Sequence, residues 1–419
     1  MRSYNIAVLT STPRLVEYRM PDNVVRALNR IGGHKIIEID YKDIYRLHGP
    51  SKAEEMVSEI LHKNKVDIVI LCLGDSYEFS IEYFSELQAQ FFCVLVSQED
   101  EHNFDKSSRY YSQAFDVVTT VGQLSVDRYK LYRIDALPYY GGYDTWDWRN
   151  LSFEKNYDVC FVGAVDNKIG RNEYLSHLIE NNINVKIFGS GSPEGVISRD
   201  AMNEVYCSSK IGLNFTGVTF SGLDRDISIN HRIQQIKARA QEIAMTGTFV
   251  LSEYSTEIGK LFEIGSEMDV FHNKEELLSK VEYYLENEEE REEMAFKAYK
   301  RAVCDYDEVH VWKNFMAEFH KRIEIKSKSS NLAKNIIYKD PIFKRAFSAF
   351  HLYQMLGFLL NGRPRNALAE FVVYMKYPFF DGGVLLHYTK RHVVSFLGSI
   401  KWLRSLVQKT KILLRKICP

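Results

Sequence analysis

Short apolar runs alternate with amphipathic segments through residue 310, and this pattern predicts repeated strand–helix units. The runs that predict buried strands in the first part of the chain lie at 6–9, 35–39, 66–73, 91–96 and 117–121. Apolar residues at helical spacing between them, at 24–31 and 53–61, predict helices. Because most of these strands are apolar along their whole length, both faces of their sheet should be covered, as in a doubly wound parallel sheet.

The same alternation returns after an aromatic, glycine-containing linker at 139–148. Its aromatic side chains either stack on a sugar or base or wedge two domains together, and we expect the second. Its strands are predicted at 157–163, 184–188 and 210–215, and its helices at 171–180, 275–285 and 288–302. Two of these strands end in glycine, at Gly163 and Gly189, where a missing side chain lets a ligand approach the backbone closely.

Residues 236–254 combine a charged helix start, a glycine stop at Gly247 and a buried strand. Lys237 and Arg239 near a helix N-terminus make an anion site, because free N–H groups and the macrodipole add to their charge. Glu242, one turn into the helix, is placed to accept hydrogen bonds from paired hydroxyls, as on a ribose. The alternative is a solvated helix start with an Arg239–Glu242 ion pair.

This stretch resembles the donor-site signature of CgeB-like (spore-maturation-type) glycosyltransferases of the GT-B fold. Ala238 stands where the family usually has glycine, and Gln241 where it has phenylalanine. Further matches in the same order occur at 158–163, 209–215 and 283–291. The resemblance, which extends from about Tyr157 to Tyr306, implies an α/β GT-B protein with two Rossmann-like, doubly wound parallel-sheet domains.

The resemblance also implies a site for a nucleoside-diphosphate sugar in the second domain. It places Gly163, Lys168 and Arg171 near the diphosphate and Gly189 near the nucleotide. The remaining residues implied for donor binding are Lys210, Asn214, Lys237, Arg239, Glu242 and Gly247. The polar insertion at 217–231 is either a flap over the donor or a plain surface loop.

An acidic cluster follows the predicted strand 91–96, at the end of a strand where ligands bind in such sheets. An inverting glycosyltransferase needs a base for the acceptor hydroxyl, and we assign this catalytic role to Asp100, with Glu99 or His102 as alternatives. The Asp-x-Asp matches at 224–226 and 305–307 are discounted as metal sites, because GT-B enzymes balance phosphate charge with cations and helix dipoles. No metal and no cofactor beyond the donor substrate are expected.

A chain of 419 residues is too long for one ordinary core. The pattern divides it into an acceptor domain at 1–150, a donor domain at 151–324 and a helical extension at 325–419. Its six cysteines are scattered with no Cys-x-x-Cys pair, which indicates reduced thiols in a cytosol. No signal-peptide pattern and no run of about 20 apolar residues is present.

The net charge of -1 hides a division between the two ends of the chain. Residues 325–419 carry 17 Lys/Arg and 3 Asp/Glu, a net of +14, so the remaining residues carry -15. A basic amphipathic segment at 384–419 indicates an anionic membrane surface as partner and a cytoplasmic, peripheral location at the inner face of the membrane. The alternatives are packing on the acidic body or RNA binding, although no nucleic acid is expected.

These observations predict a hexosyltransferase-type enzyme that uses a nucleotide sugar, with UDP as the commonest nucleotide. The acceptor is expected to be a glycan or a lipid-linked molecule in surface polysaccharide synthesis. Two alternatives stay open at this stage: a GT-B nucleotide-sugar epimerase, and a non-catalytic module that binds glycan or anionic lipid.

Overall fold

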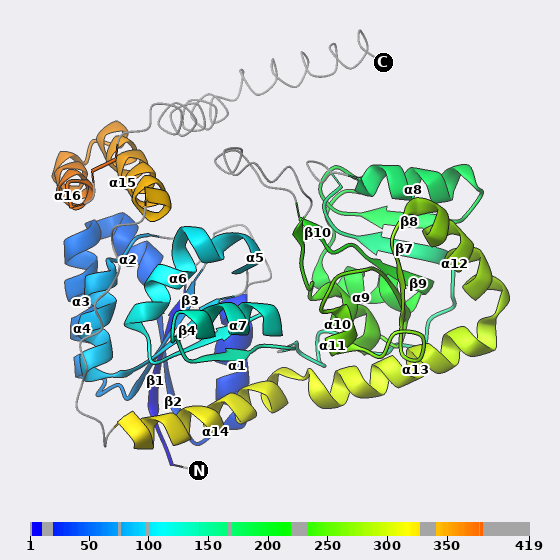
Figure 1. The fold of residues 1–419 in the computed structure, drawn as a ribbon, viewed down its shortest axis with the longest axis horizontal. Coiled ribbons are helices and arrows are strands. Elements are labelled where there is room, and N and C mark those ends of the chain that lie inside the picture. Colours follow the sequence, from blue (N-terminus) through cyan, green and yellow to red (C-terminus); the bar gives the residue numbers. More distant parts are fainter. Residues whose placement is uncertain are drawn as a thin grey trace, which may run out of the picture.

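A computed structural model describes residues 2–10, 20–73, 77–97, 100–141, 143–165, 170–218, 233–326, 341–376 and 378–379. Within them the chain forms two parallel sheets, each flanked by helices, that lie side by side (Figure 1). This arrangement confirms the predicted α/β class and GT-B fold. The basic segment 384–419 lies outside the described residues.

The N-terminal sheet has the strand order β2-β1-β3-β4-β5-β6, and all its pairs are parallel. The strands are β1 (Asn5–Thr10), β2 (Lys35–Asp40), β3 (Ile68–Leu73), β4 (Phe92–Ser97), β5 (Val117–Thr120) and β6 (Ala136–Pro138). The strand order reverses between β1 and β3, and ligands bind at the carboxyl ends of the strands at such a point.

Alternate residues of these strands enter two separate cores, as expected for a sheet covered on both faces. Ile6 and Val8 pack toward α1 (Met20–Ile31), whereas Ala7 and Leu9 pack toward the opposite face. The helices on that opposite face and around it are α2 (Tyr41–His48), α3 (Pro50–Lys63), α4 (Ile81–Gln90), α5 (Asp100–Asn103), η1 (Phe104–Ser108), α6 (Arg109–Tyr111), η2 (Ser112–Ala114) and α7 (Gln123–Leu131).

The C-terminal sheet has the order β13-β12-β9-β7-β8, again with all pairs parallel. Its strands are β7 (Tyr157–Val162), β8 (Val185–Phe188), β9 (Ser209–Asn214), β12 (Phe249–Glu253) and β13 (Asp269–Phe271). The short antiparallel pair β10 (Gly217–Val218) and β11 (Ile233–Gln234) borders the polar insertion, whose residues 219–232 lie outside the described part.

Six of the helices that the structure describes surround this second sheet. They are α8 (Arg171–Glu180), α9 (Arg199–Cys207), α10 (Arg239–Met245), α11 (Ile258–Leu261), α12 (Lys274–Glu286) and α13 (Glu288–Asp305). The predicted bounds of α8 coincide with those observed, because glycines and polar turns frame its apolar pattern.

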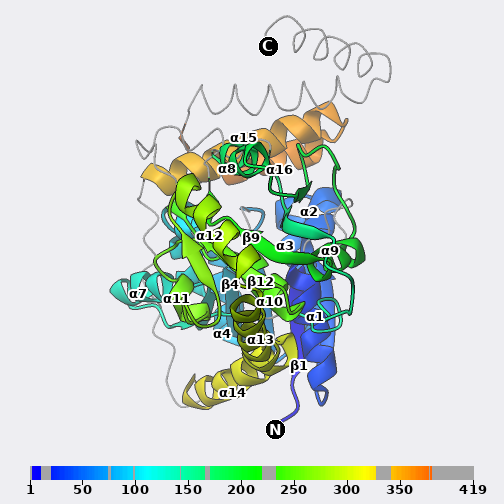
Figure 2. The same ribbon diagram turned by 90° about the vertical axis from the view of Figure 1, so that its right-hand side faces the viewer.

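The helix α14 (Glu308–Lys326) crosses back to the N-terminal domain. Trp312, Phe315 and Phe319 of α14 pack in the core that contains α1 (Figures 1 and 2). The amphipathic sequence pattern of α14 predicts a helix with one apolar face. The pattern does not indicate which of the two sheets that face covers.

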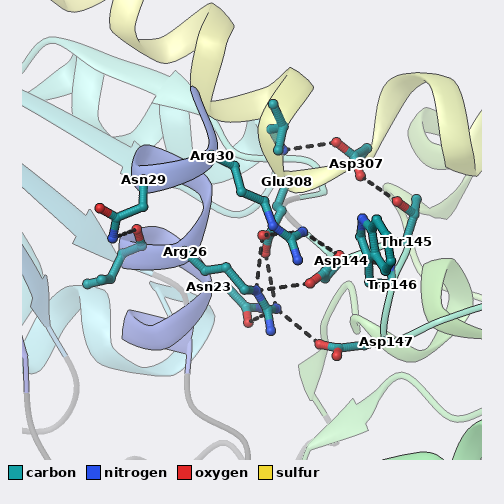
Figure 3. A network of polar contacts seen from close by, with 12 residues as sticks. Asn23, Arg26, Asn29, Arg30, Asp144, Thr145, Trp146, Asp147, Asp307 and Glu308 are labelled. Atoms are coloured by element: carbon teal, nitrogen blue, oxygen red, sulfur yellow. Dashed lines mark hydrogen bonds and ion pairs between the residues drawn. The ribbon is translucent and has the colours of Figure 1, made fainter. Parts of the chain in front are cut away.

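The linker 139–148 meets the start of α14 at a buried ionic network. Asp144 accepts from Arg30 Nη1 at 2.7 Å, and Arg26 Nε lies 3.1 Å from Glu308 Oε1 (Figure 3). Asp147 joins Arg26 to Arg199 of the other domain. The linker thus has the structural role expected for it, because its side chains bind both domains.

Two further helices, α15 (Pro341–Leu360) and α16 (Pro364–Tyr374), form a hairpin on the N-terminal domain (Figure 1). The predicted break at 362–364 separates them. Among the described residues, no helix combines the length and apolar content that crossing a bilayer requires.

Candidate active site

The carboxyl edge of the C-terminal sheet brings two glycines and an arginine into direct contact. Gly163 N donates to Phe188 O at 2.8 Å, which ties the ends of β7 and β8 together. A Cβ at Gly189, where φ is +126°, would lie 2.2 Å from Gly163 O. A Cβ at Gly163 would lie 2.6 Å from Arg239 Nη2. Only glycine at both positions permits this approach of strand ends and guanidinium.

Arg239 is the first residue of α10, and its Cζ lies 5.1 Å from the centre of the Phe161 ring. Its buried Nε has no hydrogen-bond partner within the described ranges. Lys237 is half-buried beside it, with Nζ donating to Gln235 Oε1. Since α10 has only seven residues, these side chains rather than the helix supply most of the positive charge.

Glu242 is buried on α10 with Arg239, and only 7% of its surface is exposed. Burial raises the pKa of its carboxyl to about 7, against the nearby guanidinium charges of Arg239 and Arg199, which lower it. No hydrogen bond from the described residues contributes to this balance. Tyr206 of α9, fully buried, interacts electrostatically with both Glu242 and Arg239. The arrangement presents a carboxyl group beside a cation, with no hydrogen-bond donor to it from the described residues.

Two more residues of the predicted set lie at this edge. Arg171 is 5% exposed, donates from Nη1 to Ala164 O at 2.8 Å and lies over the Phe161 ring. It therefore braces the segment that leaves β7. Asn214, at the end of β9, is fully buried and donates to Ser252 Oγ at 2.8 Å, while its Oδ1 has no partner in the described part of the chain.

Two residues of the predicted set, among those that the structure describes, are not brought to this edge. Lys210 is the second residue of β9, at the amino end of the sheet, and pairs with Asp158 Oδ1 at 2.8 Å. Gly247 follows α10 at the same amino end, where its φ of +75° confirms the predicted left-handed helix stop and a Cβ would lie 2.5 Å from Asn150 Nδ2. Lys168 lies outside the described residues.

Asp100 occupies a different environment from the one that a general base requires. It is fully buried, and its Oδ1 accepts from Ser97 Oγ at 2.6 Å and from Ser108 Oγ at 2.5 Å. Its Oδ2 accepts from Thr120 Oγ1 at 2.5 Å. A carboxylate enclosed by three hydroxyl donors favours a structural role, and the assignment of Asp100 as the catalytic base stays a prediction. Glu99 and the side chain of His102 lie outside what the structure describes.

Sequence reasoning missed two carboxylates that shape the site. Glu253 Oε2, at the end of β12, accepts from the backbone N–H groups of Thr216 and Gly217, both at 2.9 Å, and so fixes the chain where it leaves β9. Glu257 Oε1 accepts from Gln123 N at 2.5 Å and thereby joins the second domain to α7 of the first. Neither residue stands in a local pattern that indicates such a partner.

The described residues contain no group of three or more His, Cys, Asp or Glu that could hold a metal ion. Asp307 accepts from Thr145 Oγ1 at 2.9 Å and from Val309 N at 3.0 Å, which makes it part of the junction between linker and α14. The other Asp-x-Asp match, at 224–226, lies outside the described residues.

The second domain, which contains Arg239 and Glu242, is similar in sequence to a known family. Residues 171–317 match the model of a family described as glycosyl transferase-like. A search of curated proteins by sequence found no match.

Among solved structures, Anabaena HepE in complex with UDP matches with a TM-score of 0.55 at 11% identity, over 77% of this chain and 100% of that one. Sucrose-phosphate synthase from Thermosynechococcus elongatus gives 0.58 at 9% identity, over 78% and 100%. A glycosyltransferase from Rickettsia africae gives 0.52 at 12%, over 77% and 100%. HepE has also been solved with UDP-glucose, with a TM-score of 0.54 at 10% identity over 76% and 100%.

The family match falls on the domain that carries Arg239 and Glu242, and the fold is shared along most of the chain. Together they show that the chain has the GT-B fold and that its second domain is similar to a glycosyl transferase-like family.

Proposed function

We propose that this enzyme transfers a hexose from a UDP sugar to a glycan or a lipid-linked acceptor. The observation that supports this most directly is the buried Glu242 beside Arg239 at the end of β7. A carboxylate without donors suits two vicinal hydroxyls, and an adjacent guanidinium suits a phosphate. A nucleoside diphosphate carries both groups a few ångströms apart.

In this proposal the ribose hydroxyls of the donor donate to Glu242, and the diphosphate oxygens accept from Arg239 and Lys237. Gly163 and Gly189 allow the ends of β7 and β8 and the Arg239 guanidinium to approach one another closely, which holds this cation where the diphosphate would lie. Arg171 acts through the backbone that it braces at Ala164, and Lys168 follows on the same segment. Negative charge develops on the diphosphate as the sugar leaves, so these cations stabilise the transition state as well as the bound donor. They balance the phosphate charge without a metal ion.

The acceptor approaches from the N-terminal domain, at the carboxyl ends of β3, β4 and β5. For an inverting reaction the base is Glu99 or His102, which follow β4 directly in sequence. Asp100 holds Ser97, Ser108 and Thr120 together in the buried part of this domain.

UDP is proposed as the nucleotide because HepE, which shares the fold, binds UDP and UDP-glucose. The CgeB-like signature supports a place for the enzyme in surface polysaccharide synthesis. The basic segment 384–419 supports a peripheral position at the cytoplasmic face of the membrane.

The test is a thermal-shift screen of nucleotide sugars followed by product analysis with and without acceptor glycans. A bound donor at one hundred times its Kd should stabilise the protein by about 2.7 kcal/mol. We expect a UDP sugar to raise the Tm and the sugar to appear on the acceptor. Conversion of the nucleotide sugar without any acceptor would indicate an epimerase, and no Tm shift with any nucleotide would refute the donor site.

A further inference from the structure

The hairpin of α15 and α16 exposes an unusual density of apolar side chains. Seven of the nineteen large hydrophobic residues that are exposed in the described part of the chain fall within residues 359–379. They are Leu359 at 50%, Leu360 at 75%, Leu368 at 64%, Phe371 at 43%, Val372 at 59%, Met375 at 53% and Phe379 at 37%. Such clustering differs from the single exposed hydrophobic residues that any surface carries.

Four of these residues form one stripe along α16. Leu368, Phe371, Val372 and Met375 follow the spacing i, i+3, i+4 and i+7, which places them on a single helix face. The opposite face, with Ala367, Glu370 and Tyr374, is buried. The helix is therefore apolar on the side that faces away from the protein.

Contacts between the buried face of the hairpin and the N-terminal domain hold the hairpin in place, so the position of the apolar stripe on the surface is fixed. Glu370, fully buried, accepts from Tyr45 of α2 and lies 2.7 Å from His351 Nδ1 of α15. Phe343 and Phe347 of α15 belong to the core of the N-terminal domain.

The charges of the hairpin are almost all positive. Residues 341–379 contain five basic side chains, namely Lys344, Arg345, Arg363, Arg365 and Lys376. Their one acidic residue is Glu370, which is buried, so the hairpin presents no carboxylate to solvent. Residues 380–419 continue with eight Lys/Arg and one Asp. Apolar side chains flanked by cations are the combination that an anionic lipid surface attracts.

The rest of the molecule has the opposite charge. Residues 1–324 carry a net -15, so an anionic surface repels the body and attracts the hairpin. This opposition selects an orientation in which the hairpin faces the lipid.

The hairpin lies next to the segments that follow strands β3 and β4. The ring of Phe343 lies 6.1 Å from that of Tyr77, shortly after β3, and 4.7 Å from that of Tyr110, in the helical segment after β4. The hairpin therefore borders the carboxyl edge of the N-terminal sheet, at the end of that domain away from the chain's N-terminus (Figures 1 and 2).

We propose that the exposed face of α15 and α16 docks on an anionic phospholipid bilayer and holds the carboxyl edge of the N-terminal sheet against it. The acceptor side of this proposal rests on the proposed function, because a lipid-linked acceptor would then meet this edge at the membrane surface. The docking itself does not depend on the reaction.

The test measures partition of the full chain onto vesicles of phosphatidylglycerol mixed with phosphatidylcholine and onto phosphatidylcholine alone. The variant combines Leu368→Gln, Phe371→Gln and Val372→Gln. The matched control combines Ile179→Gln and Val196→Gln, whose side chains are 50% and 79% exposed on the other domain. We expect the hairpin variant to lose at least about tenfold in partition onto the anionic vesicles, since each apolar side chain that leaves the lipid forfeits transfer free energy. The control should partition like wild type.

Several results would overturn the proposal. Equal partition of the hairpin variant and wild type would assign any membrane binding to residues 380–419 alone. Light scattering that shows a wild-type dimer, a monomeric variant and no vesicle binding would make the face a contact between copies. A lowered Tm of the variant without any change in partition would show that residues 380–419 cover the stripe. Binding of UDP-glucose to the same variants by calorimetry reports on the donor site separately, so failure of the docking and failure of the proposed function are distinguishable.

Discussion

At the scale of single residues, the proposed donor site depends on the balance between burial and nearby positive charge at Glu242. Burial favours the neutral carboxylic acid, while Arg239 favours the carboxylate, and the resulting pKa of about 7 leaves both forms populated near neutral pH. Hydroxyl groups that donate to Glu242 stabilise the charged form. A bound ribose should therefore lower this pKa and release a proton.

The affinity for UDP-glucose should consequently depend on pH. Between the ordinary carboxyl pKa of 4.5 and about 7, affinity should rise with pH by up to about tenfold per unit, and Glu242→Gln should flatten this rise. Calorimetry in buffers of different ionisation enthalpy measures the released proton directly. Identical pH profiles for wild type and variant would remove Glu242 from the binding site.

The stability of the ligand-free protein should follow the opposite trend. Because the folded state holds the Glu242 proton up to about pH 7 and the unfolded state loses it near 4.5, the free energy of unfolding falls as pH rises through this window. Urea denaturation of wild type and Glu242→Gln across the window checks the sign, and a steeper fall in the variant would contradict it.

Asp100 gives the second residue-scale prediction. Asp100→Asn should lower the free energy of unfolding by roughly 1–3 kcal/mol, because one of the two oxygens that accept from the three buried hydroxyls becomes an NH2 donor, while donor affinity stays unchanged. Urea denaturation measures this loss, with the exposed Asp127→Asn as control. A variant of normal stability that has lost turnover would restore Asp100 as the base.

At the scale of elements, the sequence predicted the strands and most helices because apolar runs and glycine stops are local signals. The resemblance grouped Lys210 and Gly247 with residues such as Arg239 and Gly163. In the folded chain Lys210 and Gly247 lie at the amino edge of the C-terminal sheet, whereas the others lie at its carboxyl edge. The burial of Asp100 depends on Ser108 and Thr120, which only the folded chain brings to it. Glu257 reaches Gln123 across the domain boundary for the same reason.

The contact between β7 and α10 makes a prediction about an element end. Gly163→Ala should displace the Arg239 guanidinium, since the added Cβ would lie 2.6 Å from Nη2, and should weaken UDP-glucose binding. Adding Arg239→Ala to this variant should then cause little further loss, because the two changes remove one interaction. Gly259→Ala is the control, since its Cβ would meet only Ile264 Cδ1 at 3.6 Å. Calorimetric losses that add in full would contradict the coupling.

At the scale of the whole molecule, the two domains are joined by the linker, by α14 and by ionic contacts that cross between them. Arg26 of the first domain and Arg199 of the second share Asp147, and Arg199 also contributes to the electrostatic environment of Glu242. The proposed donor site and the domain junction thus share the charge of Arg199. The hairpin of α15 and α16 presents an apolar, cationic face beside the carboxyl edge of the N-terminal sheet, which is the edge that we assign to the acceptor.

The central claim is that this molecule binds a nucleotide sugar at Arg239 and Glu242, and calorimetric titration of UDP-glucose into wild type and Arg239→Ala tests it most directly. Wild type should bind, and the variant should bind more weakly by roughly 1.5–3 kcal/mol, or about 10- to 150-fold. Arg301→Ala, which removes a pair with Glu267 elsewhere in the same domain, should leave the affinity unchanged. No binding to wild type, or equal affinity in a folded Arg239→Ala variant, would contradict the account.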